Sequence, residues 1–179
     1  MKKLSFAQIT AARLSVEEAV RAARFPVCAV MENIRSLYNV GAAFRTSDGA
    51  LIEKLYLCGY TGAPPRREIE KTSLGSVQSV PWEHRPDTCA LLRALKGQGY
   101  HILALEHTDK SVPYTEARYR FPLCIVVGNE VEGVSDEALA LCDSAVEIPM
   151  YGIKQSLNAS VAYGIIAYHL VNEYRKANP

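Results

Sequence analysis

The chain has 179 residues, of which 49% are hydrophobic and 22% charged, and its net charge is +1. This size and apolar content fit one globular domain with a substantial core and argue against extensive disorder. No apolar run approaches the roughly 20 residues that span a bilayer, and the basic start Met1–Leu4 lacks the apolar stretch of a signal peptide. We therefore expect a soluble cytoplasmic protein without a membrane segment.

Predicted secondary structure begins with a short helix from Ser15 to about Arg24. Ser15-Val-Glu-Glu18 has the pattern of a capping box, and Phe25-Pro26 ends the helix. Residues 1–24 carry a net charge of +3 and are assigned to an N-terminal helical extension, and residues 25–179 to the main domain. The basic residues of the extension are Lys2, Lys3, Arg13, Arg21 and Arg24.

Strands and helices alternate through the rest of the chain. Strands are predicted at 27–30, 54–58, 101–105, 123–127 and 145–148, and helices at 39–51, 87–96, 135–141 and 158–174. Residues 59–86 contain seven Gly or Pro and are predicted to be a long functional loop with at most short structured pieces. The alternation predicts an α/β domain whose mostly parallel sheet is flanked by helices.

The five cysteines are odd in number and widely spread, with no Cys-x-x-Cys pair and no histidine at a zinc-ligand spacing. Several lie in apolar segments, where a free thiol packs as a small hydrophobic group. We interpret them as structural thiols of a reducing compartment and expect no metal site. They are Cys28, Cys58, Cys89, Cys124 and Cys142.

Three segments place polar residues and glycines between a strand and a helix. In residues 33–46, Asn39 is predicted to cap a helix that also carries Arg45. In residues 123–133, a buried strand runs into a turn with Gly128 and Gly133, where backbone can approach a ligand closely. Glu130 in this turn would either face a site or accept hydrogen bonds from backbone amides.

The third segment, residues 148–160, passes from a strand through a glycine-containing loop into the last helix. Ser156 and Asn158 bring a hydroxyl and an amide to the start of that helix. Simple N-capping is the alternative to a role in a site.

Together, the three segments resemble the signature motifs of the SpoU/TrmH family of the SPOUT superfamily. The order of the motifs matches, and they span residues from about 27 to 174. The matching residues are Asn39-Val-Gly with Arg45-Thr46, then Gly128-Asn-Glu130 with Gly133, and then Ile148-Pro-Met with Ser156-Leu-Asn158.

The resemblance implies an RNA methyltransferase that transfers a methyl group from S-adenosylmethionine to a ribose 2'-hydroxyl of tRNA or rRNA, without a metal. It implies a C-terminal deep trefoil knot, an exception to the rule that chains do not thread their own loops. It also implies a homodimer with the active site across the subunit interface. The methyl donor would bind in the knot, largely to backbone groups of Leu105, Gly128, Ile148, Met150 and Leu157.

The same resemblance assigns the central catalytic role to Arg45, either as a base or as a clamp for an oxyanion. Because a guanidinium stays protonated at ordinary pH, we favour the clamp or a phosphate-binding part. Glu130, Ser156 and Asn39 would orient the ribose and Arg45, while Asn158 would fix the third loop.

The RNA contacts are predicted from charge. Arg66, Arg67 and Lys71 in the long loop are candidates for phosphate binding, and the N-terminal extension is a second candidate patch. Residues 125–148 hold six acidic and no basic residues, so RNA phosphates should avoid them. The alternative is that both charged stretches are merely solvated faces.

Two rival functions stay open: a knotted dimer that binds RNA without methylating it, and a base methyltransferase of another SPOUT branch. A dinucleotide-binding domain, an NTPase and a serine hydrolase are disfavoured because their glycine-rich or nucleophile motifs are missing. The sequence does not indicate which RNA or nucleotide is modified, or whether a partner protein is needed.

Overall fold

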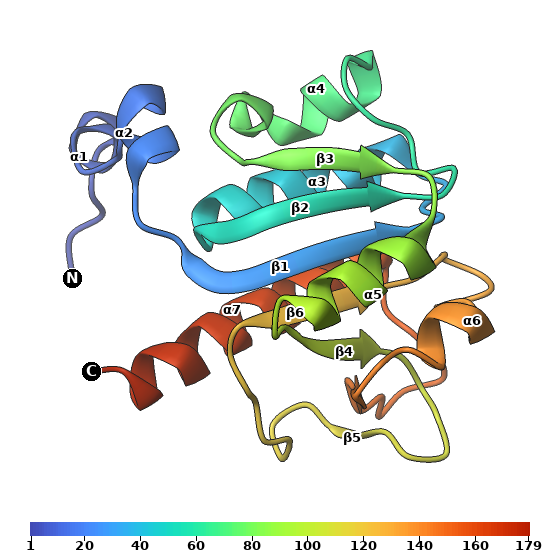
Figure 1. Ribbon diagram of the computed structural model, residues 1–179. Coiled ribbons are helices and arrows are strands. Elements are labelled where there is room, and N and C mark those ends of the chain that lie inside the picture. The colour runs from blue at the N-terminus through green and yellow to red at the C-terminus, as the bar shows by residue number, and fades with distance from the viewer.

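A seven-stranded parallel sheet forms the centre of the computed structural model, which describes residues 1–179 (Figure 1). The strand order is β3-β2-β1-β6-β4-β7-β5, and every neighbouring pair is parallel. All the strands therefore end at the same edge of the sheet, where α/β proteins bind ligands. The strands are β1 (Phe25–Glu32), β2 (Ile52–Cys58), β3 (Trp82–Arg85), β4 (His101–Leu105), β5 (Val112–Pro113), β6 (Leu123–Val127) and β7 (Ser144–Glu147).

Helices cover both faces of the sheet, with α3 and α7 on one face and α5 and α6 on the other (Figure 1). Alternate residues of β1 enter the two cores: Val27 and Ala29 pack with α3 and α7, whereas Cys28 and Val30 pack with α5. The helices are α1 (Phe6–Ala11), α2 (Val16–Arg21), α3 (Leu37–Gly49), α4 (Arg67–Ser73), α5 (Thr88–Gly97), α6 (Asp136–Leu139) and α7 (Ala159–Ala177), with a 3₁₀ helix at Ser76–Gln78.

The predicted α/β class and parallel sheet are confirmed, and the predicted strands at 101–105 and 123–127 match β4 and β6 residue for residue. No helix in the chain combines the length and apolarity that crossing a membrane requires. All five cysteines are free thiols, and burial raises the pKa of Cys28 and of Cys58 to about 12. Both therefore behave as packed, unreactive groups.

The predicted long loop at 59–86 contains three short structured pieces, α4, the 3₁₀ helix and β3, whose positions the sequence did not indicate. The glycines and prolines mark the ends of these elements: Pro64 and Pro65 precede α4, and Gly75 follows it. Ile69 of α4 is fully buried, and β3 pairs with β2 at the edge of the sheet. Because Ile69 is the only apolar residue of α4, the sequence of this helix shows no hydrophobic periodicity from which a helix could be predicted.

The caps of the helices were predicted with mixed success. The capping box at Ser15 and the cap at Asn158 are confirmed, but α3 is capped by Ser36 rather than by Asn39. Asn39 stands three residues inside α3, so its side chain is free for another contact. The short helix α1 was not predicted, and none of its residues is buried.

Candidate active site

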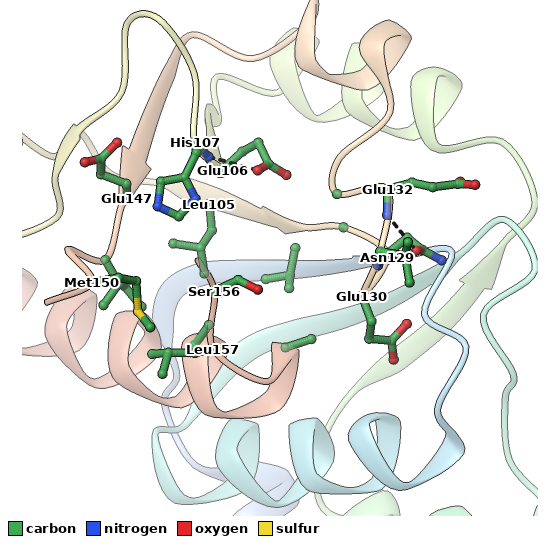
Figure 2. A pocket seen from close by; sticks show the side chains of 17 residues that line it. Leu105, Glu106, His107, Asn129, Glu130, Glu132, Glu147, Met150, Ser156 and Leu157 are labelled. Atoms are coloured by element: carbon green, nitrogen blue, oxygen red, sulfur yellow. Dashed lines mark hydrogen bonds between the residues drawn. The ribbon is translucent and has the colours of Figure 1, made fainter. Parts of the chain in front are cut away.

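A pocket opens at the carboxyl ends of β4, β6 and β7, between the turn after β6 and the loop that leads into α7 (Figure 2). It encloses about 210 Å³ and is lined by both apolar and acidic side chains. Among the lining residues are all five of the predicted donor contacts: Leu105, Gly128, Ile148, Met150 and Leu157.

The turn after β6 forms one wall of this pocket, and it can be built only from glycine at two positions. A Cβ on Gly128 would lie 2.1 Å from the carbonyl carbon of Gly133. Gly133 itself has a φ of +74°, and a Cβ there would lie 2.2 Å from Oε2 of Glu106. Asn129 and Gly133 exchange two backbone hydrogen bonds of 2.9 and 3.0 Å across the turn. The result is a tight wall whose backbone is accessible from the pocket.

Asn129 holds the same turn with its side chain. Its Oδ1 accepts hydrogen bonds from the amides of Val131 (2.7 Å) and Glu132 (3.0 Å). Its Nδ2 donates to the carbonyl oxygen of Asn33 (2.9 Å) and to the hydroxyl of Tyr60 (2.7 Å). Both donors and both acceptor positions of this buried amide are therefore used within the protein.

Two carboxylates fix the chain that leaves the turn. Oε2 of Glu106 accepts from the amide of Val134 at 2.9 Å. Glu32, only 2% exposed, accepts from the amide and the hydroxyl of Ser135, each at 2.9 Å. The supporting roles of Glu32, Glu106 and Asn129 were not predicted from the sequence. The available signal was a polar residue directly after an apolar run, at the end of a strand.

Glu130 joins the pocket turn to the start of α3. Its Oε2 accepts from the amide of Arg35 (2.9 Å), and its Oε1 accepts from the amide of Ser36 (3.1 Å) and from Nδ2 of Asn39 (2.8 Å). Burial alone would raise the pKa of Glu130, but these hydrogen bonds outweigh it and hold the pKa below the ordinary 4.5. Glu130 is therefore an ionised acceptor, and the amides that it binds belong to a different segment of the chain.

The same network reaches the third segment through Asn39. Nδ2 of Asn158 donates to Oδ1 of Asn39 at 3.0 Å, while Oδ1 of Asn158 accepts from the amide and hydroxyl of Ser160. The hydrogen-bonded series Glu130–Asn39–Asn158 thus connects residues from three distant segments. It sets the position of α3 relative to the pocket.

Ser156 lines the pocket, but Arg45 does not. Arg45 lies six residues beyond Asn39 on α3, a rise of about 9 Å, and its side chain is exposed. There it lines a shallow depression with Lys71, Thr72 and Tyr168. Within one chain, the predicted catalytic arginine and the donor pocket are therefore separate.

One of the three predicted RNA-binding residues, Lys71, lines the same depression as Arg45. Arg66 occupies the N-cap position of α4 without a side-chain capping bond, and Arg67 and Lys71 lie on this helix rather than in a loop, which corrects the sequence-based assignment. Arg67 and Lys71 line a second depression with Tyr38, Glu68 and Glu70, and Lys71 borders the depression of Arg45 as well. Arg67, Lys71 and Arg45 thus place three basic side chains on the outer surface of α3 and α4, with Glu68 and Glu70 between them on α4.

Comparison with known proteins relates the chain to one group of enzymes. The model of the SpoU rRNA methylase family matches residues 26–168. The tRNA (guanosine(18)-2'-O)-methyltransferase of Thermus thermophilus is 34% identical over 167 residues, which are 93% of this chain and 85% of the relative. The crystal structure of the A. aeolicus TrmH/SpoU tRNA modifying enzyme matches with a TM-score of 0.81 and 31% identity, over 90% of this chain and 82% of that one. The structure of an AdoMet-bound rRNA methyltransferase from Sinorhizobium meliloti matches with a TM-score of 0.77 and 26% identity, over 88% of this chain and 58% of that one.

Proposed function

Since the chain belongs to the SpoU rRNA methylase family, we propose that it is an RNA methyltransferase that uses S-adenosylmethionine to methylate a ribose 2'-hydroxyl. The observation that carries this proposal is the pocket at the ends of β4, β6 and β7. It is lined by every residue expected to contact the methyl donor, and the hydrogen bond that Nδ2 of Asn39 donates to Glu130 connects it to the helix that carries Arg45.

The pocket residues fit S-adenosylmethionine in polarity and charge. Apolar side chains such as Leu105 and Leu157 suit the adenine ring, and the glycine turn offers backbone groups. The donor carries a net positive charge, and the lining includes no Lys or Arg. When bound, the donor supplies an electrophilic methyl group for an in-line displacement. The acidic lining residues are Glu106, Glu130, Glu132 and Glu147.

The protein residues must orient the 2'-oxygen and stabilise the negative charge that develops on it. Arg45 is suited to the second task because its guanidinium stays charged, and we assign it to the oxyanion or to the neighbouring phosphate. Both oxygens of Glu130 already accept hydrogen bonds, so Glu130 orients α3 instead of removing the proton. Asn39 and Asn158 hold this arrangement, and Ser156, in the pocket wall, orients the ribose.

A second copy of the chain completes the site in this proposal, by bringing its Arg45 to the pocket of the first. The separation of Arg45 from the pocket supports this assignment. So do exposed apolar side chains near both features: Tyr168 of α7 is 50% exposed, and Ile153 of the pocket loop is fully exposed.

A mixed dimer tests this arrangement. Arg45→Ala and Gly128→Val, each inactive alone, should regain about a quarter of wild-type activity when co-refolded, because half of the dimers then contain one complete site. Activity that stays at the level of the separate variants would contradict the shared site.

We infer that the RNA substrate is tRNA, the substrate in the name of the 34% identical relative. Arg66, Arg67 and Lys71 would bind phosphates next to Arg45, and the basic extension 1–24 would add a second contact. A cytoplasmic location follows from this substrate and agrees with free, packed thiols.

The C-terminal trefoil knot is likewise part of the proposal. Its support is the match to solved structures of the family and the course of residues 148–158. This loop leaves β7, lines the pocket opposite the 128–133 turn, and reaches Asn39 through Asn158. A threaded chain would hold the two pocket walls together without a covalent link.

The reaction is tested with purified protein, methyl-labelled S-adenosylmethionine and an unmodified tRNA transcript. Nuclease digestion and mass spectrometry then locate the methyl group. We expect a 2'-O-methylated nucleotide. A methylated base would identify a base methyltransferase, and binding of tRNA without transfer would identify an inactive RNA-binding relative. Either result would overturn the proposal.

A further inference from the structure

Tyr60 is unusual among the exposed aromatic residues because its hydroxyl is held by a buried side chain. Tyr60 is 61% exposed and lies just after β2, at the edge of the sheet where the pocket opens. Its hydroxyl accepts a 2.7 Å hydrogen bond from Nδ2 of Asn129, a residue that lines the pocket. An exposed tyrosine normally rotates in water, so this contact restricts the ring to one orientation.

The backbone on both sides of Tyr60 is also fixed. Gly59 has a φ of +62°, and a Cβ there would lie 1.9 Å from Oδ1 of Asn33. The same Oδ1 accepts from the amide of Tyr60 at 3.3 Å. On the other side, the hydroxyl of buried Thr61 donates to the carbonyl of Met31 and accepts from the amide of Ile34, each at 2.9 Å. The turn is therefore rigid where the aromatic ring projects into solvent.

No other group in the protein contacts the hydroxyl of Tyr60 through a hydrogen bond, so its own proton is available to a ligand. Asn129, by contrast, has no hydrogen-bonding capacity left. The ring is thus one hydrogen bond away from the donor pocket, and it presents an apolar surface with one free donor at its rim.

We propose that Tyr60 is a base-stacking residue, which receives an unstacked nucleobase of the RNA next to the ribose that is methylated. This inference rests on the proposed function. Single-stranded RNA is recognised largely by stacking of exposed bases on aromatic side chains. A ring that is already oriented loses little conformational freedom on binding, which favours affinity.

The charge of the turn that Tyr60 contacts through Asn129 points to a base rather than to a phosphate. The neighbouring turn belongs to the acidic stretch 125–148, which repels phosphates. Stacking on a neutral ring does not require a positive environment. Phosphates would instead lie over the basic residues of α3 and α4, so the RNA would present its bases to one side of the site and its backbone to the other.

Two substitutions separate stacking from a purely structural role. Tyr60→Leu removes the aromatic face, and Tyr60→Phe keeps the face but removes the hydroxyl. For Tyr60→Leu we expect KM for tRNA to rise between about 5-fold and about 150-fold. The Kd for S-adenosylmethionine, measured by calorimetry, should change less than about twofold. Tyr60→Phe should retain a KM within about threefold of wild type, because stacking persists.

Removal of the base provides the matching test on the RNA. With tRNA that is abasic at one nucleotide at or beside the methylation site, Tyr60→Leu and wild type should have equal KM values, because the stacked base is missing from both complexes. An unchanged KM in Tyr60→Leu, or a KM penalty that persists on every such abasic tRNA, would overturn the proposal. Weaker binding of S-adenosylmethionine in both variants would also overturn the proposal, because Tyr60 would then serve to hold Asn129 in the pocket wall. Dissociation of a wild-type dimer by Tyr60→Leu would make the ring a subunit contact and would also overturn it. A wild-type protein without transfer to any tRNA would refute the proposed function itself.

Discussion

Replacing Glu130 with Gln removes one negative charge from the junction of the pocket turn and α3, with almost no change in side-chain size. The carboxylate accepts hydrogen bonds from the amides of Arg35 and Ser36 and from Nδ2 of Asn39. A Gln side chain has one oxygen, so its NH₂ group must face at least one of these donors. An unsatisfied donor costs about 1–3 kcal/mol when buried, and Glu130 is only half-buried, so we expect a loss of about 1–2 kcal/mol.

Urea unfolding at several pH values measures this loss. The pKa of Glu130 is lowered in the folded state, so its contribution to stability is complete above the unfolded pKa near 4.5 and disappears as pH falls through the folded pKa. The difference in free energy of unfolding between wild type and Glu130→Gln should therefore be constant from about pH 6 to about pH 8 and should shrink below about pH 4.5. Other carboxylates titrate in both proteins and cancel from the difference.

Glu132→Gln is the matched control, because Glu132 is exposed and its carboxylate makes no hydrogen bond within the protein. Its stability should equal that of the wild type within about 0.5 kcal/mol at every pH. A Glu130→Gln difference below about 0.5 kcal/mol at neutral pH, or one that persists unchanged at about pH 3, would refute this role of the carboxylate.

Three further predictions concern the donor, the acceptor and the RNA. Arg45→Ala should lower kcat by about 100-fold or more while donor affinity by calorimetry stays within about twofold, and near-normal turnover would remove Arg45 from the mechanism. Gly128→Ala should weaken donor binding at least about tenfold, because its Cβ would lie 2.1 Å from the carbonyl carbon of Gly133; unchanged affinity would show that the donor does not depend on this wall. Removing the charges of Arg67 and Lys71 together should weaken tRNA binding and reduce the slope of log K against log salt by about 2, whereas an unchanged slope would exclude them from phosphate contact.

The central strands were predictable from sequence because their apolar runs are consecutive and end at polar residues. Residues 123–127 are fully buried on both faces, and a continuous Leu-Cys-Ile-Val-Val run indicates such burial directly. The elements between residues 59 and 86 were missed because their burial depends on packing against α3, which the sequence does not reveal. In α4, moreover, only Ile69 is a strongly apolar residue.

Several of the residues that line the pocket could be predicted from the sequence, but their hydrogen-bond partners and relative positions could not. Ser36 and Asn39 are both residue types that cap helices well. Ser36 is the cap here, and the Asn39 side chain instead donates a hydrogen bond to Glu130, which is 91 positions away in the sequence. The supporting role of Glu32 likewise depends on Ser135, 103 positions away. Sequence patterns identify such residues as polar groups at strand ends, whereas their partners emerge only when the chain folds.

In the proposed reaction a single oxygen, that of the ribose 2'-hydroxyl, accepts the methyl group. The most direct test is a tRNA in which only that oxygen is missing, with a 2'-deoxynucleotide at the position that mass spectrometry identifies as modified. We predict that this tRNA binds with nearly normal affinity and receives no methyl group. Methyl transfer to the same nucleotide of the deoxy-substituted tRNA would contradict the account, because the acceptor would then lie on the base.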